Sequence, residues 1–203
     1  MKSHPFTITT RSDAEALGLG ANNLWKQLLE EKGKSSDYAK GFKVKYSQDV
    51  KYGVSIGIHR DYFVKYGLNK AVKKQIALAI FQEVSMAYES MQKINIFSSS
   101  SFEPSDLVSN ILSFYFFVEN YTKESIFALC NKRSREESLA IYKLYPETFT
   151  DEKYKNRKFT PRFFPNKYCT EMTFPKEFQR IKLVTKDGKL FRDWNNYDDK
   201  PPK

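Results

Sequence analysis

The sequence predicts an α+β fold: two long central helices forming a buried core, one or two small antiparallel β-hairpins, and a long irregular C-terminal cover. Three observations favour this fold. Residues 71–121 hold two apolar runs with helical spacing, joined by the polar run Ser98–Ser101. Residues 42–46 and 50–58 alternate between apolar and polar positions, which is typical of strands. The pair Asp187-Gly188 separates two short apolar segments, which indicates a hairpin turn.

The composition indicates a globular chain. Its 203 residues include 40% hydrophobic side chains, with 17 Phe and 13 Tyr, which is enough to form a core. We therefore expect a single domain over residues 1–203, with tails at 1–10 and 195–203. The net charge of +10 favours an acidic ligand or surface, such as nucleic acid or anionic lipid, although scattered lysines are also typical of ordinary surfaces.

The location of the protein and its use of cofactors are predicted from segments and motifs that the sequence lacks. The start at Met1–Pro5 has no apolar signal-peptide segment, so a cytoplasmic protein is expected, or an envelope or secreted one if the N-terminus is incomplete. The longest apolar run, Ile111–Val118, is too short to span a bilayer. Without export, Cys130 and Cys169 should be free thiols. The sequence shows no nucleotide-binding or zinc-binding spacing, so neither a cofactor nor a metal is expected.

The N-terminal part of the chain predicts a helical segment. Residues 12–33 begin with a capping-box pattern at Ser12, and Gly18 and Gly20 interrupt the segment. The side chains expected to contact the core are Trp25, Leu28 and Leu29.

The two alternating segments predict a hairpin. Residues 42–46 and 50–58 should pair across a turn at Ser47–Asp49. Gly53 and Gly57 weaken a strand unless something approaches closely, so we expect a helix, a ligand or another backbone to pack there.

His59 is a candidate catalytic residue at the end of the second strand. A single His in such a place is usually structural. Its side chain nevertheless titrates near neutral pH and could transfer protons, and it is one of only two His residues in the chain.

The first central helix should begin after Asn69, which is a good N-cap. One of its sides carries the apolar stripe Val72, Ile76, Ile80, Val84, Ala87 and Met91. The other side is expected to be polar and carries Gln75, Gln82, Ser85 and Glu89. Glu83 breaks this pattern because it projects between Ile76 and Ala79. It is either a core-edge carboxylate paired with Lys or Arg, or a catalytic carboxylate with a raised pKa.

The second central helix follows Pro104 and is apolar on most of its surface, so it should be buried. Its main stripe is Leu107, Ile111, Phe114, Val118 and Tyr121. A narrow polar strip contains Asp106, Ser109, Asn110 and Ser113. Polar groups on a buried helix need partners. They therefore either bond a covering loop or line a substrate pocket together with Glu83, in which case Glu83 and Asn110 share one polar pocket.

The C-terminal half predicts smaller elements. Helices are expected over residues 122–131 and 135–145, and residues 148–176 should form an irregular cover. Basic and aromatic side chains alternate over residues 153–164. The candidate anion-binding residues there are Lys155, Arg157, Lys158 and Arg162. Such mixing can hold phosphates and stack bases, but it is also typical of a loop that packs its aromatic rings inward and leaves its charges in water.

The run Ser101–Asn110 is similar to the S-x-F-S-x-E-D-L-x-S-N signature of an uncharacterised bacterial family, domain of unknown function 4056. Residues 75–85 and 156–165 resemble two further segments of that family, so the resemblance covers roughly residues 70–180 with gaps. The family helix often carries a His-Glu pair, and Gln82 stands here in place of that His. This departure argues against a metal or catalytic role for such a pair. The resemblance implies no established function, and the export signals of many family members have no counterpart here.

Three functions remain open. The first is a non-catalytic binding or structural module with a polar pocket between its central helices. The second is a hydrolase-like enzyme in which Glu83 is the general acid or base, assisted by Asp106, Asn110 and His59. The third is a nucleic-acid or anionic-surface binder that uses residues 153–164, with nucleic acid the less favoured partner.

Overall fold

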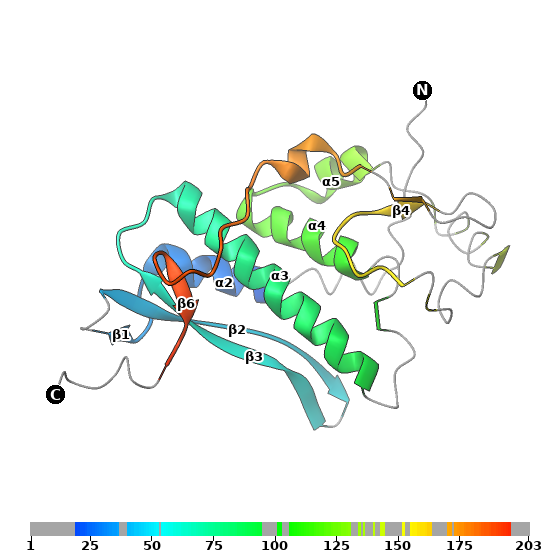
Figure 1. The fold of residues 1–203 in the computed structure, drawn as a ribbon. Helices are drawn as coiled ribbons and strands as arrows, with labels where there is room; N and C mark the ends of the chain where they lie inside the picture. The colour runs from blue at the N-terminus through cyan, green and yellow to red at the C-terminus, as the bar shows by residue number, and fades with distance from the viewer. Residues whose placement is uncertain are drawn as a thin grey trace. The chain divides into compact units, whose positions relative to one another are not determined.

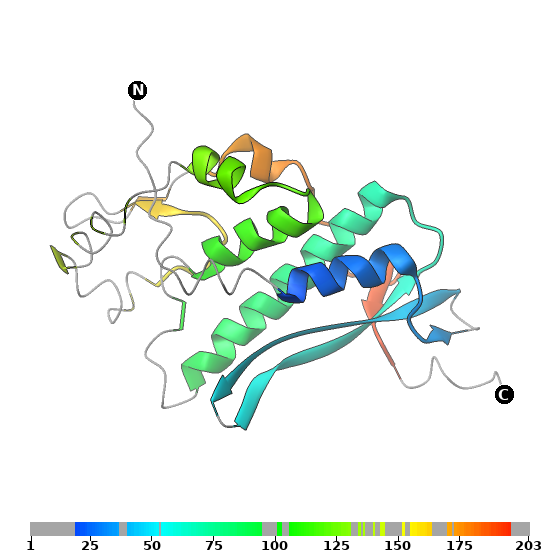
Figure 2. The ribbon, with the colours of Figure 1, turned by 180° about the vertical axis from the view of Figure 1, so that it is seen from behind.

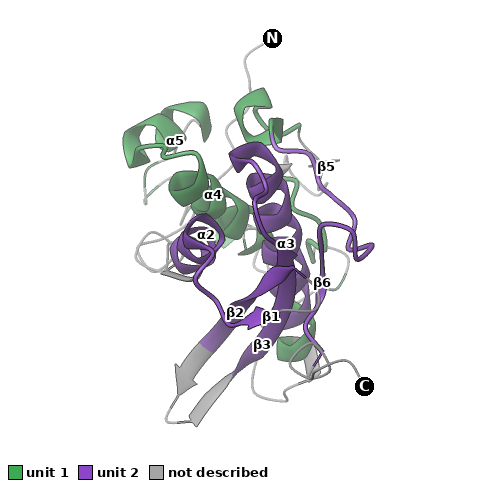
Figure 3. Ribbon diagram, turned by 90° about the vertical axis from the view of Figure 1, so that its left-hand side faces the viewer, with its two compact units in different colours: residues 1–18, 89–180 green, residues 19–88, 181–203 purple. Residues whose placement is uncertain are grey.

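The fold is α+β, as the sequence predicted, in a computed structural model that combines helices with two antiparallel sheets (Figure 1). The chain forms two compact units. Unit 1 contains residues 1–18 and 89–180, and unit 2 contains residues 19–88 and 181–203 (Figure 3). The single domain expected from the sequence stays a prediction. The structure describes residues 19–36, 40–52, 54–94, 101–102, 106–130, 134, 136, 140, 143–144, 152, 155–163, 170–171 and 173–195.

The sheet of unit 2 has the strand order β1-β2-β3-β6, with antiparallel pairing throughout. Its strands are β1 (Ser35–Ser36), β2 (Gly41–Tyr52), β3 (Val54–Lys65) and β6 (Phe191–Asp193). The predicted turn at Ser47–Asp49 is wrong, because Ser47 pairs with His59 inside the ladder and the strands reverse between Tyr52 and Val54. The physical reason is that Gln48 lies on the face that the helices cover, where its amide donates a hydrogen bond to the Ser85 hydroxyl. The strand therefore continues through this polar residue.

The predicted hairpin around Asp187-Gly188 is also wrong. Residues 181–184 form no strand, and β6 instead adds to β3, with Val64 opposite Phe191. The tight turn itself is present. Gly188 has a φ of 83°, its N–H donates to the carbonyl of Phe191, and Asp187 accepts a hydrogen bond from the Lys189 N–H. An isolated two-stranded hairpin is only marginally stable, whereas pairing with the edge of β3 makes β6 part of a larger sheet.

Two helices cover one face of this sheet (Figure 3). Helix α2 (Leu19–Glu30) lies along β2 (Figure 2) and buries Leu24, Trp25 and Leu28. Leu29, expected in the core, is 45% exposed, because the next residue along a helix is turned by about 100° away from the buried stripe. The side-chain amide of Gln27 accepts from the Lys45 N–H and donates to the Lys45 carbonyl, both at 2.9 Å.

Helix α3 (Lys70–Ile94) begins as predicted, with the Asn69 side chain accepting from the Val72 N–H at 3.0 Å. The centre of its predicted stripe, Ile76, Ile80 and Val84, is fully buried, whereas the outer members Val72, Ala87 and Met91 are half-buried. The predicted polar side is partly wrong, since Ser85 and Glu89 are buried.

Unit 1 is built on helix α4 (Asp106–Val118), which is mostly buried as predicted, and α5 (Lys123–Cys130), where Thr122 caps the first turn. The short strands β4 (Arg162–Phe163) and β5 (Thr170–Glu171) pair, and η3 (Lys176–Gln179) follows them. The rings of Tyr115, Tyr121 and Phe174 surround Phe178 at centroid distances of 5.4, 5.7 and 5.3 Å. The predictions of a helix at 135–145, a loop at 98–101 and two tails lie largely outside the described residues. In the described part of the chain, no helix is both long and apolar enough to cross a membrane.

Gly57 fulfils one expectation from the sequence. A Cβ at this position would lie 2.4 Å from the Asp49 Cβ and 2.5 Å from the Gln48 carbonyl oxygen, so the neighbouring strand is the close backbone that was expected. Gly53 lies outside the described residues.

Candidate functional site

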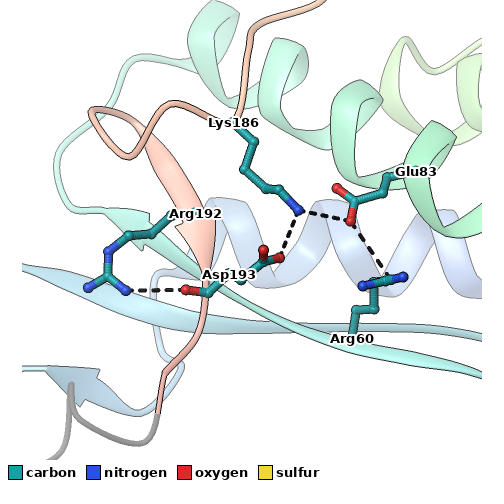
Figure 4. A network of polar contacts seen from close by, with 5 residues as sticks. All are labelled: Arg60, Glu83, Lys186, Arg192 and Asp193. Atoms are coloured by element: carbon teal, nitrogen blue, oxygen red, sulfur yellow. Dashed lines mark hydrogen bonds and ion pairs between the residues drawn. The ribbon is translucent and has the colours of Figure 1, made fainter.

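Glu83 lies at the centre of a charged cluster in unit 2 (Figure 4). Its Oε1 is 2.9 Å from the Lys186 Nζ and 3.8 Å from the Arg60 Nε. The side chain is 30% exposed, so it sits at the rim of the core. Of the two interpretations of Glu83, the pairing with Lys or Arg is therefore confirmed. A catalytic role for Glu83 stays a prediction.

Lys186 connects two carboxylates. Its Nζ donates to Glu83 and also to Asp193 Oδ1 at 2.8 Å, and it stands 5.8 Å from the centroid of the Tyr62 ring. Partial burial lowers the pKa of Lys186, but the hydrogen bonds to Asp193 and Glu83 outweigh burial and raise the pKa above its ordinary value. The cluster thus joins α3, β3, β6 and the segment before β6 through side-chain charges.

Tyr62 is the buried aromatic residue next to this cluster. Its side chain is fully buried, and its hydroxyl has no hydrogen-bond partner of good geometry among the described residues. Burial raises the pKa of Tyr62, and the negative charge of Glu83 raises it further. The phenol therefore stays protonated well above physiological pH and is a hydrogen-bond donor.

A second polar group lies under α3. The Gln48 amide donates to the Ser85 hydroxyl at 2.8 Å and to the Tyr46 hydroxyl at 3.2 Å. Burial raises the pKa of Tyr46, which keeps this phenol neutral as well. These contacts explain why Ser85 is buried although serine is a polar residue that is usually exposed.

His59 is not brought to Glu83. Strand alternation places His59 on the opposite face of β3 from Arg60, whose guanidinium contacts Glu83. His59 is exposed there, directly across from Ser47. The catalytic combination of Glu83 with His59 therefore gains no geometric support from this arrangement.

The polar strip of α4 lies in unit 1. Asp106, Ser109 and Asn110 are half-buried, and Ser113 is buried with no hydrogen-bond partner for its hydroxyl among the described residues. Glu83 belongs to unit 2, so the shared pocket of Glu83 and Asn110 stays a prediction.

Glu89, which was expected to point outward, is 4% exposed and accepts a hydrogen bond from the Phe102 N–H at 2.8 Å. The physical reason is that a buried backbone N–H needs an acceptor and a carboxylate is a strong one. Sequence reasoning missed Glu89, although a signal exists. Leu78, Phe81, Ser85 and Glu89 follow one another at helical spacing, so two apolar residues and two polar residues share one buried side.

The basic segment of unit 1 folds around Asn156, which is 1% exposed. The Asn156 N–H donates to the Phe102 carbonyl at 2.9 Å, and its side-chain amide donates to the Thr160 carbonyl at 3.0 Å. The Arg157 guanidinium lies 4.6 Å from the centroid of the Phe102 ring and forms an ion pair with Glu152 at 2.7 Å.

Among the candidate anion-binding residues, Arg157 and Lys158 are exposed and Lys155 is half-buried. Arg162 lies in β4. The segment therefore meets only in part the expectation that its rings pack inward and its charges stay in water, because Arg157 is ion-paired with Glu152. Its inward anchor is an asparagine, while Phe159 is only half-buried. Lys153 and Phe164 lie outside the described residues.

Cys130 is a buried free thiol, as predicted, and Cys169 lies outside the described residues. Burial raises the pKa of Cys130 from 9.0 to about 12. We expect Cys130, isolated by Cys169→Ser, to react with a thiol reagent at pH 8 at least about a hundredfold more slowly in the folded protein than in urea, because the thiolate is the reactive form. Equal rates would contradict this placement.

The same shift has a consequence for stability. Above pH 9.0 the unfolded thiol ionises while the folded one stays neutral, and this ionisation favours the unfolded state. The contribution of the Cys130 thiol to the free energy of unfolding is therefore fully present below pH 9.0 and is lost as the pH rises toward about 12. Cys130→Ala should show the smaller fall in melting temperature over that range.

In the part of the chain that the structure describes, no group of three or more His, Cys, Asp or Glu residues could hold a metal ion. Comparisons of the chain with protein-family models, curated proteins and solved structures found no match. The resemblance to domain of unknown function 4056 therefore stays a prediction.

Proposed function

We propose that this chain is a non-catalytic binding or structural module in which Glu83 has a structural role. The observation that carries the proposal is the double contact of Glu83 Oε1 with Lys186 and Arg60. A general acid or base needs an oxygen that can reach the substrate. Here the contacts of that oxygen join α3 to β3 and to the segment that leads into β6.

The surroundings of the cluster support the same role. Asp193 shares Lys186 with Glu83, so two carboxylates and two cations balance one another. The neighbouring Tyr62 phenol is neutral and buried. Among the described residues of this cluster, the hydroxyl beside a carboxylate is that of Tyr62 beside Glu83, and the Tyr62 side chain is fully buried, where a substrate could not reach it.

Glu83→Gln should lower the free energy of unfolding by about 0.5–1 kcal/mol, because a partly exposed ion pair contributes about that much. Urea denaturation measures the loss, which should shrink in high salt because salt screens the lost attraction. The matched control is Glu30→Gln. The Glu30 carboxylate is 3.9 Å from Lys26 and 3.8 Å from Lys32 on an exposed surface, so its replacement should have almost no effect.

The opposite outcome would favour the hydrolase-like alternative. In that case Glu83→Gln would leave the melting temperature unchanged or raise it, and would abolish an activity found in a screen of ester, amide and glycoside substrates. Asp106→Asn and Asn110→Ala would then be expected to lower the same activity.

A further inference from the structure

The sheet of unit 2 has a second face, opposite to the one that α2 and α3 cover, and this second face carries a row pattern of its own (Figure 3). Strand pairing fixes its side chains in rows, since directly opposed residues share a face. Lys43, Phe63 and Arg192 form one row. Lys45 and Asp61 form the next row, where the backbone N–H of Trp194 donates to the Asp61 carbonyl at 2.9 Å. We call this surface the basic–aromatic face, and its residues are Lys43, Lys45, Phe63, Lys65, Arg192 and Trp194.

The cations of this face lie over its aromatic rings. The Arg192 guanidinium is 4.6 Å from the centroid of the Phe63 ring, and the Lys43 Nζ is 5.2 Å from that of Trp194. These distances are those of cation–π contacts. Each of the two rings therefore has a cation of the same face over it, and the Phe63 ring beneath Arg192 is buried.

The charge of this face is positive. It carries the cations Lys43, Lys45, Lys65 and Arg192, and within the same rows Asp61 is the only carboxylate, 2.6 Å from the Lys43 Nζ. Asp49 stands two rows beyond Lys45, across from Gly57. Lys45 and Lys65 are exposed at the two ends of the face.

We infer that the basic–aromatic face binds single-stranded nucleic acid, with Lys45 and Lys65 holding phosphates and Trp194 and Arg192 stacking against bases. The positive charge of the face matches phosphates, and the indole of Trp194 and the guanidinium of Arg192 are planar groups on which a base can stack. Lipid headgroups and duplex backbones match the charge but offer no free base to stack. This inference rests on the proposed function, since it names the ligand class of a binding module. It uses a different surface from residues 153–164.

The test is fluorescence anisotropy of a labelled oligo(U) 12-mer titrated with the full chain over a range of salt concentrations. Lys45→Gln with Lys65→Gln should weaken binding at least tenfold and reduce the salt slope by about 1.4, since each phosphate contact on a single strand contributes about 0.7. The control is Lys26→Gln with Lys32→Gln, which removes the same charge from exposed positions on and just after α2. This pair should change the dissociation constant by less than twofold.

Stacking is tested separately at Trp194. Trp194→Ala should weaken binding about tenfold, and Trp194→Phe should restore most of the affinity because phenylalanine keeps a stacking surface. Oligo(U) should also quench the intrinsic fluorescence of the protein, because Trp194 is half-buried whereas the other tryptophan, Trp25, is buried in α2. Thermal melts of each variant confirm that it is folded before binding is measured.

Several results would overturn the inference. The first two are equal losses of affinity for oligo(U) in the two double-lysine variants, and an unchanged affinity in Trp194→Ala. The other two are duplex DNA or heparin binding as tightly as oligo(U), and binding to anionic vesicles but not to oligo(U). None of these bears on Glu83. The proposed function fails instead if Glu83→Gln abolishes an activity without loss of stability, so the two failures are distinguishable.

Discussion

Phe102→Ala should lower the free energy of unfolding by about 3–5 kcal/mol, the range for removing a buried phenylalanine ring. The ring is 1% exposed, and the Arg157 guanidinium covers it. The backbone at Phe102 has a φ of 55°, in the left-handed region that L-residues rarely adopt. It is held there from both sides, because Glu89 accepts from its N–H and Asn156 donates to its carbonyl. Without the ring, this strained turn loses the packing that offsets its strain.

Urea denaturation of Phe102→Ala measures this effect. Phe116→Ala is the control, since Phe116 is a half-buried phenylalanine of α4 in the same unit. Its replacement should cost less than half as much. A cost for Phe102→Ala no greater than that of the control would show that the turn is not an anchor of unit 1.

Gly33→Ala should lower the free energy of unfolding by about 3 kcal/mol or more, at the upper end for inserting a group where there is no room. A Cβ at this position would lie 1.8 Å from the Lys43 carbonyl oxygen. That oxygen belongs to the backbone of β2, so no side-chain rotation relieves the clash. The Lys43 N–H also donates to the Lys34 carbonyl, so the two segments cannot separate without losing that hydrogen bond.

The matched control for Gly33→Ala is Gly67→Ala. A Cβ at Gly67 would meet nothing within 4 Å, and its φ of 70° is the sole obstacle. The left-handed conformation alone costs an alanine about 1–2 kcal/mol. Melting temperatures that fall equally in the two variants would show that the contact at Gly33 is relieved by a small shift of the chain.

The parts of the fold that depend on neighbouring residues were predictable from the sequence. The N-cap at Asn69, the centre of the α3 stripe and the existence of the paired strands β2 and β3 follow from local spacing, and these were confirmed. The turn position was not predictable, because Ser47–Asp49 have the composition of a turn and yet remain in the ladder. Their place was decided by Ser85, a residue far along the chain that bonds Gln48.

The candidate site shows the same division. Glu83 was recognisable as a carboxylate that needs a cation, because it interrupts an apolar stripe. Its partner Lys186 was not, since it comes from a segment 103 residues away that was assigned to a separate hairpin. Glu89 was misplaced for a related reason, because its acceptor role depends on the unusual backbone of Phe102.

The paired hydrogen bonds of Gln27 with Lys45 have a consequence for self-association. Beyond its short pairing with β1, the outer edge of β2 presents backbone N–H and C=O groups, and such an edge can recruit a strand from another molecule. The amide of Gln27 satisfies both backbone groups of Lys45 in the way that a peptide group of an added strand would, and the Asn23 side chain accepts from the same Gln27 amide at 2.9 Å. An incoming chain must therefore break two formed bonds before it gains any, and at this position the sheet resists growth into a fibre or a swapped dimer.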